Sequence, residues 1–154
     1  MKTYAIPSLA FLIAATCAGV AHARVHNGMD GIPGGNPTAV NSCFAPSGGS
    51  ITNTCATSEG WYLPLVIDTT GAKSPVINAR GDANPEFGWE ASRCRGYRID
   101  PNGVITSSTL WVYFDTGADQ EKTLASMTLA ANQTYLVGCY IGAYGQINSY
   151  RYAQ

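Results

Sequence analysis

The chain has 154 residues, a formal net charge of −1, 12% charged residues and 45% hydrophobic residues. This composition excludes a disordered tail and a highly charged nucleic-acid-binding arm, and the length is about that of one domain. The 17 Gly and 8 Pro beside 9 Tyr and 3 Trp predict many turns between β-prone segments. We therefore expect an all-β domain.

Residues 1–23 have the features of a secretory signal peptide. A basic start at Lys2 is followed by an apolar stretch from Leu9 to Val20, and a small-x-small cleavage site ends at Ala23. Loss of Lys2 leaves eight basic and ten acidic residues, so the mature chain is mildly acidic. No later segment has the roughly 20 apolar residues of a membrane span. We expect a secreted or periplasmic product with no membrane anchor and no nucleic-acid partner.

Four cysteines follow the signal peptide, and an even number in an exported chain predicts two disulfides with three possible pairings. We favour Cys43 with Cys55, because they bracket a Pro-Ser-Gly-Gly turn. We pair Cys94 with Cys139, because each lies within a predicted strand. A zinc site is disfavoured, since no Cys-x-x-Cys pair occurs and His26 is the only histidine left.

Residues 24–41 are rich in turn formers and have few side chains that could fill a core, so we expect an irregular leader. Residues 42–154 alternate short apolar runs with turn clusters. This pattern predicts one domain, an antiparallel two-sheet β-sandwich of about eight strands, with a closed barrel as the alternative. The expected strands include 61–67, 76–80, 89–100, 110–114, 123–129, 135–141 and 147–152.

The segment 110–114 is apolar on both faces. Leu110, Val112 and Phe114 share one side, whereas Trp111 and Tyr113 share the other. Such a strand either lies at the centre of a sheet or carries exposed aromatic rings. The tyrosines concentrated in 135–152 are expected to cap the core, with a binding surface as the alternative.

One predicted strand combines guanidinium groups with aromatic rings. Its members Trp89, Arg93, Arg95, Tyr97 and Arg98 form our candidate ligand face. Guanidinium donors beside aromatic platforms would suit an anionic sugar or an acidic partner. The alternative is a polar outer face whose arginine stems cover apolar neighbours.

Asp115, Asp119 and Glu121 form a weak candidate for a calcium site. They lie in one loop and offer the oxygen ligands that Ca²⁺ takes. The spacing does not match an EF-hand, and a turn with solvated acidic residues is the favoured interpretation. We expect no other metal site and no cofactor.

No catalytic set is visible in the sequence. Nucleophilic catalysis needs a base, usually histidine, and His26 lies in the leader. Glu86 and Glu90 could form a carboxylate pair for glycoside hydrolysis, although solvated carboxylates are favoured. The loop 81–88 is a candidate for protease inhibition. The chain is therefore expected not to be an enzyme.

Five short segments carry a resemblance to other proteins: Cys-Phe-Ala-Pro at 43–46, Ser-Ile-Thr-Asn-Thr at 50–54, Tyr-Leu-Pro-Leu-Val-Ile-Asp at 62–68, Cys-Arg-Gly-Tyr at 94–97 and Tyr-Leu-Val-Gly-Cys at 135–139. Together they resemble small, uncharacterised secreted proteins of environmental bacteria. The resemblance implies an all-β secreted domain and carries no activity or site. In those proteins a Cys-Pro pair stands where this chain has Leu63-Pro64, which leaves open a different wiring of the first disulfide.

These observations predict an exported, non-catalytic β-sandwich that binds a surface, an extracellular glycan or a protein. The alternative is a subunit of an extracellular assembly or matrix, in which the leader adds a strand to a neighbouring molecule. A secreted hydrolase or a protease inhibitor is less favoured.

Overall fold

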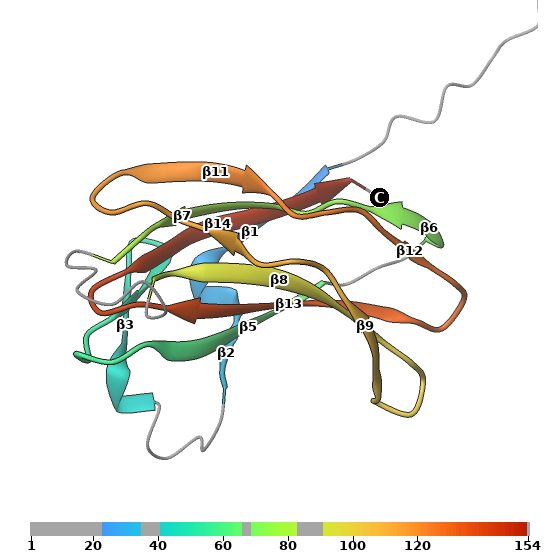
Figure 1. The fold of residues 1–154 in the computed structure, drawn as a ribbon, viewed down its shortest axis with the longest axis horizontal. Coiled ribbons are helices and arrows are strands. Elements are labelled where there is room, and N and C mark those ends of the chain that lie inside the picture. The colour runs from blue at the N-terminus through green and yellow to red at the C-terminus, as the bar shows by residue number, and fades with distance from the viewer. Residues whose placement is uncertain (1–22, 35–40, 66–68, 83–90, 154) are drawn as a thin grey trace, which may run out of the picture.

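The computed structural model describes residues 23–34, 41–65, 69–82 and 91–153. The described residues form β-strands and two short 3-10 helices, and Figure 1 shows the strands stacked in two layers. Every strand pair within the sheets is antiparallel. The predicted all-β class and the antiparallel sandwich are therefore confirmed. The proposed signal peptide lies outside the described residues except for Ala23, where β1 begins.

Sheet A forms one layer, in the order β11-β7-β14-β4-β3. Strand β14 is long enough to pair with β4 near its start and with β1 along the rest of its length. The strands of sheet A are β1 (Ala23–Asn27), β3 (Phe44–Ser47), β4 (Ser50–Asn53), β7 (Val76–Arg80), β11 (Asp119–Thr123) and β14 (Gln146–Ala153).

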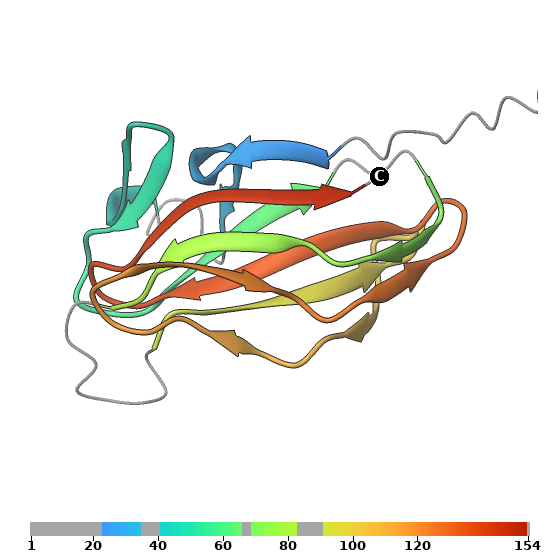
Figure 2. The ribbon, with the colours of Figure 1, turned by 90° about the horizontal axis from the view of Figure 1, so that it is seen from above.

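Sheet B forms the other layer, in the order β10-β8-β13-β5-β2, with β9 paired to β8 (Figures 1 and 2). Its strands are β2 (Ile32–Pro33), β5 (Glu59–Leu65), β8 (Arg93–Ile99), β9 (Ile105–Ser108), β10 (Val112–Tyr113) and β13 (Thr134–Ile141). The remaining elements are the pair β6 (Gly71–Lys73) and β12 (Met127–Leu129) and the 3-10 helices η1 (Gly28–Asp30) and η2 (Asn41–Cys43).

The core lies between the two sheets and follows from side-chain alternation. Along a strand, successive side chains point to opposite faces, so every second residue is buried. In β5 the buried set is Trp61, Leu63 and Leu65, as the sequence predicts. The other sheet strands contribute Ile51, Ile77, Ala79, Cys94, Tyr135, Val137, Cys139, Ile141, Ile147, Tyr150 and Tyr152.

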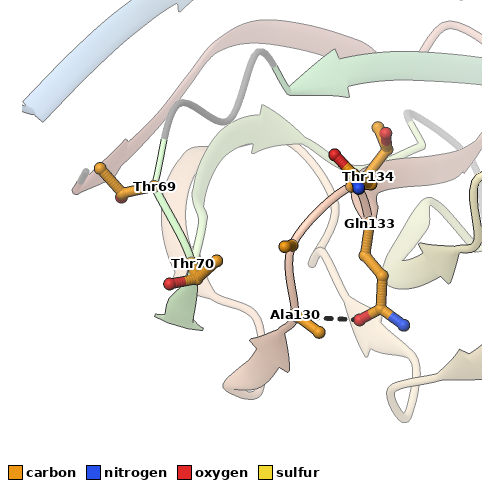
Figure 3. Close-up of a pocket in the computed structure, with 7 residues that line it drawn as sticks. Thr69, Thr70, Ala130, Gln133 and Thr134 are labelled. Carbon is orange, nitrogen blue, oxygen red and sulfur yellow. Dashed lines mark hydrogen bonds between the residues drawn. The ribbon is translucent and has the colours of Figure 1, made fainter.

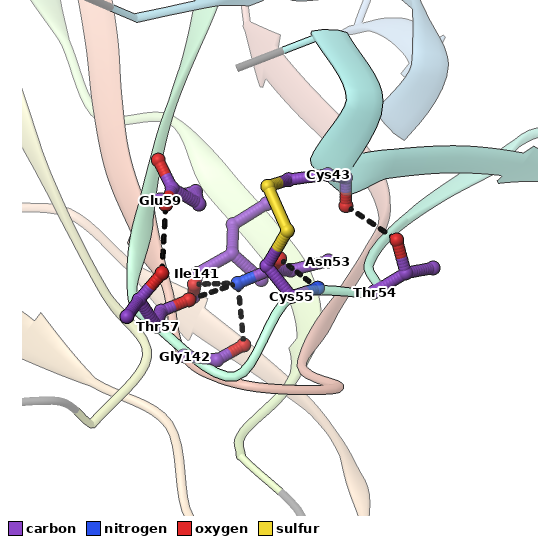
Figure 4. The surroundings of a disulfide bond; sticks show 8 residues. All are labelled: Cys43, Asn53, Thr54, Cys55, Thr57, Glu59, Ile141 and Gly142. Carbon is purple, nitrogen blue, oxygen red and sulfur yellow. Dashed lines mark hydrogen bonds between the residues drawn. A yellow bond between two sulfur atoms is a disulfide. The ribbon is translucent and has the colours of Figure 1, made fainter. Parts of the chain in front are cut away.

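Two disulfides stabilise this sandwich, with the pairing that the sequence analysis favours. Cys94 and Cys139 stand opposite each other on β8 and β13, so their bridge joins two adjacent strands of sheet B from the core side. Cys43 and Cys55 bracket the β3–β4 hairpin at the edge of sheet A (Figure 4). The first disulfide is thus not rewired.

A buried asparagine connects this hairpin to sheet B. Asn53 is fully buried, and its Nδ2 donates hydrogen bonds to the carbonyls of Thr57 (2.7 Å), Ile141 (2.8 Å) and Gly142 (3.2 Å), as Figure 4 shows. Its Oδ1 accepts from the backbone N–H of Cys55 at 2.9 Å. Buried polar groups are stable only when hydrogen-bonded, and this side chain meets that condition on both of its polar atoms.

The expectation of an irregular leader over 24–41 is wrong for its described part, and residues 35–40 lie outside the description. β1 pairs with β14, and β2 pairs with β5. Turn-forming composition did not reveal this, because a strand at a sheet edge needs only backbone hydrogen bonds and a few contacts. His26 supplies one, stacking on Tyr150 with 4.9 Å between ring centroids. Trp61 supplies another by donating from Nε1 to the Gly28 carbonyl at 2.9 Å.

The strands in the described part of the chain are more numerous than the expected eight, and several are shorter than predicted. The predicted strand 123–129 is divided between β11 and β12, which belong to different sheets. The predicted strand 110–114 reduces to the two residues of β10 at the edge of sheet B. Within the described ranges, no helix has the length and hydrophobicity to cross a membrane.

Candidate functional site

The outer face of sheet B carries most of the candidate ligand residues. On β8, Cys94 faces the core, so Arg93, Arg95 and Tyr97 point outward by alternation. The pairing register places Arg93 opposite Tyr140 on one side and opposite Tyr113 on the other. Residues far apart in sequence therefore meet on one surface.

Two arginines interleave with three aromatic rings on this face. The Arg95 guanidinium carbon lies 4.6 Å from the Tyr97 ring centroid and 4.2 Å from that of Trp111. The Arg93 guanidinium carbon lies 5.1 Å from the Trp111 ring centroid and 5.2 Å from that of Tyr140. These distances are typical of cation–π contacts. We refer to Arg93, Arg95, Tyr97, Trp111 and Tyr140 as the aromatic-arginine cluster.

A glycine lets the rings lie flat against the sheet. Gly138 on β13 stands opposite both Arg95 and Tyr62. A Cβ atom at Gly138 would lie 2.5 Å from Cε2 of Tyr97 and 3.1 Å from Cε1 of Tyr62. The two rings therefore occupy the space above the β13 backbone. Tyr97 is 9% exposed although it is on the outer face.

The hydroxyl of Tyr62, next to the cluster, is neutral at physiological pH. Burial raises the pKa of Tyr62, the neighbouring Tyr97 and Tyr140 raise it further, and Arg95 opposes this shift. A neutral phenol both donates and accepts a hydrogen bond. The surface thus combines cationic donors with the neutral hydroxyl group of Tyr62.

The cluster is open to solvent on one side. Tyr140 is 41% exposed and Tyr113, beside it on the outer face, is 48% exposed. Trp111 is half-buried, and its ring lies 5.6 Å from that of Tyr140 at a tilt of 54°. Aromatic side chains with one packed and one exposed side are typical of binding surfaces, because they present a rigid, partly apolar area to a ligand.

The structure brings only part of the candidate ligand face together on one surface. Arg93, Arg95 and Tyr97 belong to the cluster, whereas Trp89 lies outside the described residues. Arg98 falls on the opposite parity of β8, where its Nε donates to Thr106 Oγ1 at 3.1 Å and its Nη1 to the Thr128 carbonyl at 3.4 Å.

Sequence reasoning missed Trp111, Tyr140 and Tyr62 as members or neighbours of the cluster. One signal for Trp111 was present, because the two-sided apolar pattern of 110–114 allowed exposed rings. For Tyr140 and Tyr62 the deciding fact is the register of β5, β13 and β8, which links distant segments.

Two of the three acidic side chains of the candidate calcium loop pair with basic residues. Asp115 pairs with Lys122 Nζ at 3.3 Å, and Glu121 accepts from Arg151 Nη1 and Nη2 at 2.6 and 2.8 Å. Arg151 holds the pKa of Glu121 below its ordinary value through this hydrogen bond. Asp119 is placed at the start of β11. Across the described ranges, no three metal-ligating side chains of His, Cys, Asp or Glu are gathered.

A shallow cavity of about 400 Å³ lies where the turn before β13 meets the segment before β6 (Figure 3). Its lining consists of Thr69, Thr70 and residues 130–134. Gln133 Oε1 accepts the Ala130 backbone N–H at 2.9 Å across its rim. The lining has no aromatic or titratable side chain, so we do not treat this cavity as the main site.

Two further candidates cannot be placed. The carboxylate pair of Glu86 and Glu90 and most of the candidate inhibitory loop 81–88 lie outside the described residues.

No protein-family model matches the chain, and no curated protein matches it by sequence. Solved structures match its fold. The CBM36-1 domain of a multidomain xylanase from the hindgut metagenome of Trinervitermes trinervoides is 8% identical, with a TM-score of 0.50 over 86% of this chain and 97% of that domain. A family 35 carbohydrate binding module from Clostridium thermocellum is 10% identical, with a TM-score of 0.50 over 86% of this chain and 98% of that one.

A Podospora anserina GH26-CBM35 β-(1,4)-mannanase is 14% identical, with a TM-score of 0.52 over 86% of this chain, and the match spans 28% of the mannanase. At these identities the likeness establishes the fold alone. The protein is a small all-β, disulfide-bearing β-sandwich that resembles carbohydrate-binding modules in its fold.

Proposed function

We propose that this protein is an exported, non-catalytic module that binds glycans through the aromatic-arginine cluster. The observation that carries the proposal is the cluster itself, because it gathers Trp111, Tyr140 and two arginines on one open sheet face. Sugar rings offer apolar C–H faces bordered by hydroxyl groups. Aromatic rings can pack against the C–H faces, and arginine donors can hydrogen-bond to the hydroxyl groups.

The fold neighbours support this proposal. The xylanase domain is named as a family 36 carbohydrate-binding module, and the Clostridium thermocellum protein as a family 35 module. The name of the mannanase includes a family 35 module. A fold alone does not fix a function, since one architecture hosts many sites. The cluster supplies the site-level argument that the fold lacks.

Export is part of the proposal. The protein has two disulfides, and disulfides form and persist in oxidising compartments. Residues 1–23 also have the pattern of a signal peptide. The resemblance to small secreted proteins of environmental bacteria points the same way. The glycan would then be an extracellular or cell-surface polysaccharide.

The experiment is isothermal titration calorimetry of the mature protein against a panel of neutral and acidic polysaccharides. For a polysaccharide that binds, Trp111→Ala and Tyr140→Ala should each weaken affinity at least about tenfold, as expected for central aromatic contacts. Tyr144→Ala is the matched control, because Tyr144 is a 55% exposed tyrosine in the turn between β13 and β14. Undiminished affinity in both cluster variants, or no binding to any member of the panel, would refute the proposal.

A further inference from the structure

We infer that the aromatic-arginine cluster selects an acidic glycan and that Arg95 is the residue that pairs with its carboxylate or sulfate group. This inference rests on the proposed function and adds the class of ligand to it. The shared chemistry of the two groups is a pair of anionic oxygens that a guanidinium can hold through two parallel hydrogen bonds.

Arg95 is held in one orientation before any ligand arrives. Its guanidinium lies over both the Tyr97 ring and the Trp111 ring, at 4.6 and 4.2 Å from their centroids. Its Nε also donates to the Tyr97 hydroxyl at 2.7 Å. A long arginine side chain loses much rotamer freedom on binding, and an arginine that is already fixed loses less.

The contact to Tyr97 uses Nε and leaves the terminal nitrogens Nη1 and Nη2 for a ligand. Among the described residues, Arg95 donates a hydrogen bond to the Tyr97 hydroxyl and forms no ion pair. The neighbouring outward positions hold Gly138 and Tyr140 on β13, and Gly60 and Tyr62 on β5, none of which is acidic. The positive charge of Arg95 therefore faces π-systems and no described carboxylate.

Arg151 on sheet A is an arginine of the same protein whose terminal nitrogens are hydrogen-bonded to a carboxylate. Its two terminal nitrogens donate to the two carboxylate oxygens of Glu121 at 2.6 and 2.8 Å. This is the bidentate geometry that planar anions form with guanidinium groups. Arg95 presents the same donor pair on the outer face of sheet B, and we assign an anionic group of the glycan to it.

The test measures affinity for pairs of polysaccharides that differ in charge and share a backbone. Polygalacturonate is compared with its fully methyl-esterified neutral form, and dextran sulfate is compared with dextran. The variants are Arg95→Gln, Arg95→Lys and Arg151→Gln. Arg95→Gln and Arg151→Gln remove the same charge, so they separate a specific contact from a change in net charge.

We expect a charged polysaccharide to bind at least about tenfold more tightly than its neutral counterpart, since a charge-assisted hydrogen-bond pair exceeds a neutral one by that factor or more. Arg95→Gln should remove this preference, Arg95→Lys should restore it in part, and Arg151→Gln should leave it intact. Preference for polygalacturonate identifies a carboxylate ligand, and preference for dextran sulfate identifies a sulfate ligand.

Equal affinity within both pairs would overturn the inference, and so would an equal loss in Arg95→Gln and Arg151→Gln. If a neutral polysaccharide then binds and Trp111→Ala weakens it, the proposed function stands while the acidic ligand is rejected. If no polysaccharide binds at all, both fail.

Discussion

The outer faces of the two sheets differ in how their polar groups are used. On sheet A, polar side chains form a ladder across β7 and β14: Arg80 donates to Gln146 at 2.5 Å, Gln146 to Asn148 at 2.6 Å, and Asn148 to Asn78 at 2.7 Å. Each group finds its partner within the protein. These side chains are therefore hydrogen-bonded without a ligand.

The outer face of sheet B carries rings in the place of that ladder. Arg95 contacts Tyr97 and Trp111 through their π faces, and its terminal nitrogens point to no described acceptor. Tyr140 and Tyr113 remain exposed beside it. The two faces thus differ in whether their polar groups are already hydrogen-bonded to neighbours, and this difference, more than burial or charge, singles out the candidate site.

The largest expected effect concerns the disulfide beneath the sheet B face. In the chain-entropy model the Cys94–Cys139 bridge, with a sequence separation of 45, is worth about 4 kcal/mol, and the Cys43–Cys55 bridge, with a separation of 12, about 3 kcal/mol. We predict that replacing both Cys94 and Cys139 by alanine lowers the free energy of unfolding more than replacing both Cys43 and Cys55 by alanine. Urea denaturation measures both variants, and a reversed order would show that the edge hairpin matters more than sheet B.

The next prediction uses two glycines of the same face. Gly138→Ala should lower the free energy of unfolding by about 1–3 kcal/mol, because the new Cβ displaces the rings of Tyr97 and Tyr62. Gly60→Ala is the control, since its Cβ would meet Gly34 Cα at an ordinary 3.5 Å. Urea unfolding and the near-ultraviolet circular dichroism of the tyrosines report the change. Equal effects of both substitutions would contradict the packing described for the cluster.

A smaller effect is expected on sheet A. Asn148 is at the centre of the ladder, where it bonds to Asn78, Gln146 and Ser50. Asn148→Ala should cost about 1 kcal/mol of stability, the typical net value of a partly buried hydrogen bond. Glycan affinity should not change, because the residue lies on the other sheet. A loss of affinity without unfolding would move the site to sheet A.

The smallest effect concerns the ion pair of Glu121 with Arg151. Its hydrogen bond from Arg151 lowers the pKa of Glu121 from the ordinary 4.5 in the folded state. The stabilisation is therefore present above pH 4.5 and is lost as the pH falls through the lower folded value. Glu121→Gln should be slightly less stable than the parent at neutral pH, with a difference that disappears in acid and shrinks in salt. Denaturation at several pH values measures this, and a difference that grew in acid would have the wrong sign.

The sequence predicted those parts of the fold that depend on local alternation. The burial of Trp61, Leu63 and Leu65 follows from the period of two, and the pairing of Cys94 with Cys139 follows from two strand-like segments. The leader was predicted less well. Its pairing partner, β14, lies more than 100 residues away, and no local pattern encodes such a contact.

The candidate site was predicted from composition, and the structure changes its membership. A dense group of arginine and aromatic residues drew attention to β8, which contributes Arg93, Arg95 and Tyr97 to the aromatic-arginine cluster. Arg98 was included because all arginines of the segment were treated as one face, although strand parity separates it from Arg95. Trp111 and Tyr140 were left out because their place beside Arg93 depends on inter-strand register, which one sequence does not reveal.

The most direct measurement for the central claim is an NMR titration of the ¹⁵N-labelled protein with an oligogalacturonate, following indole and side-chain amide signals. The indole N–H of Trp61 donates to the Gly28 carbonyl in the core and serves as the internal reference. Binding at the outer face of sheet B predicts a shift of the Trp111 indole signal, with Trp61 and the Asn78 and Asn148 amides unchanged. Shifts confined to Asn78 and Asn148, with Trp111 unmoved, would contradict it.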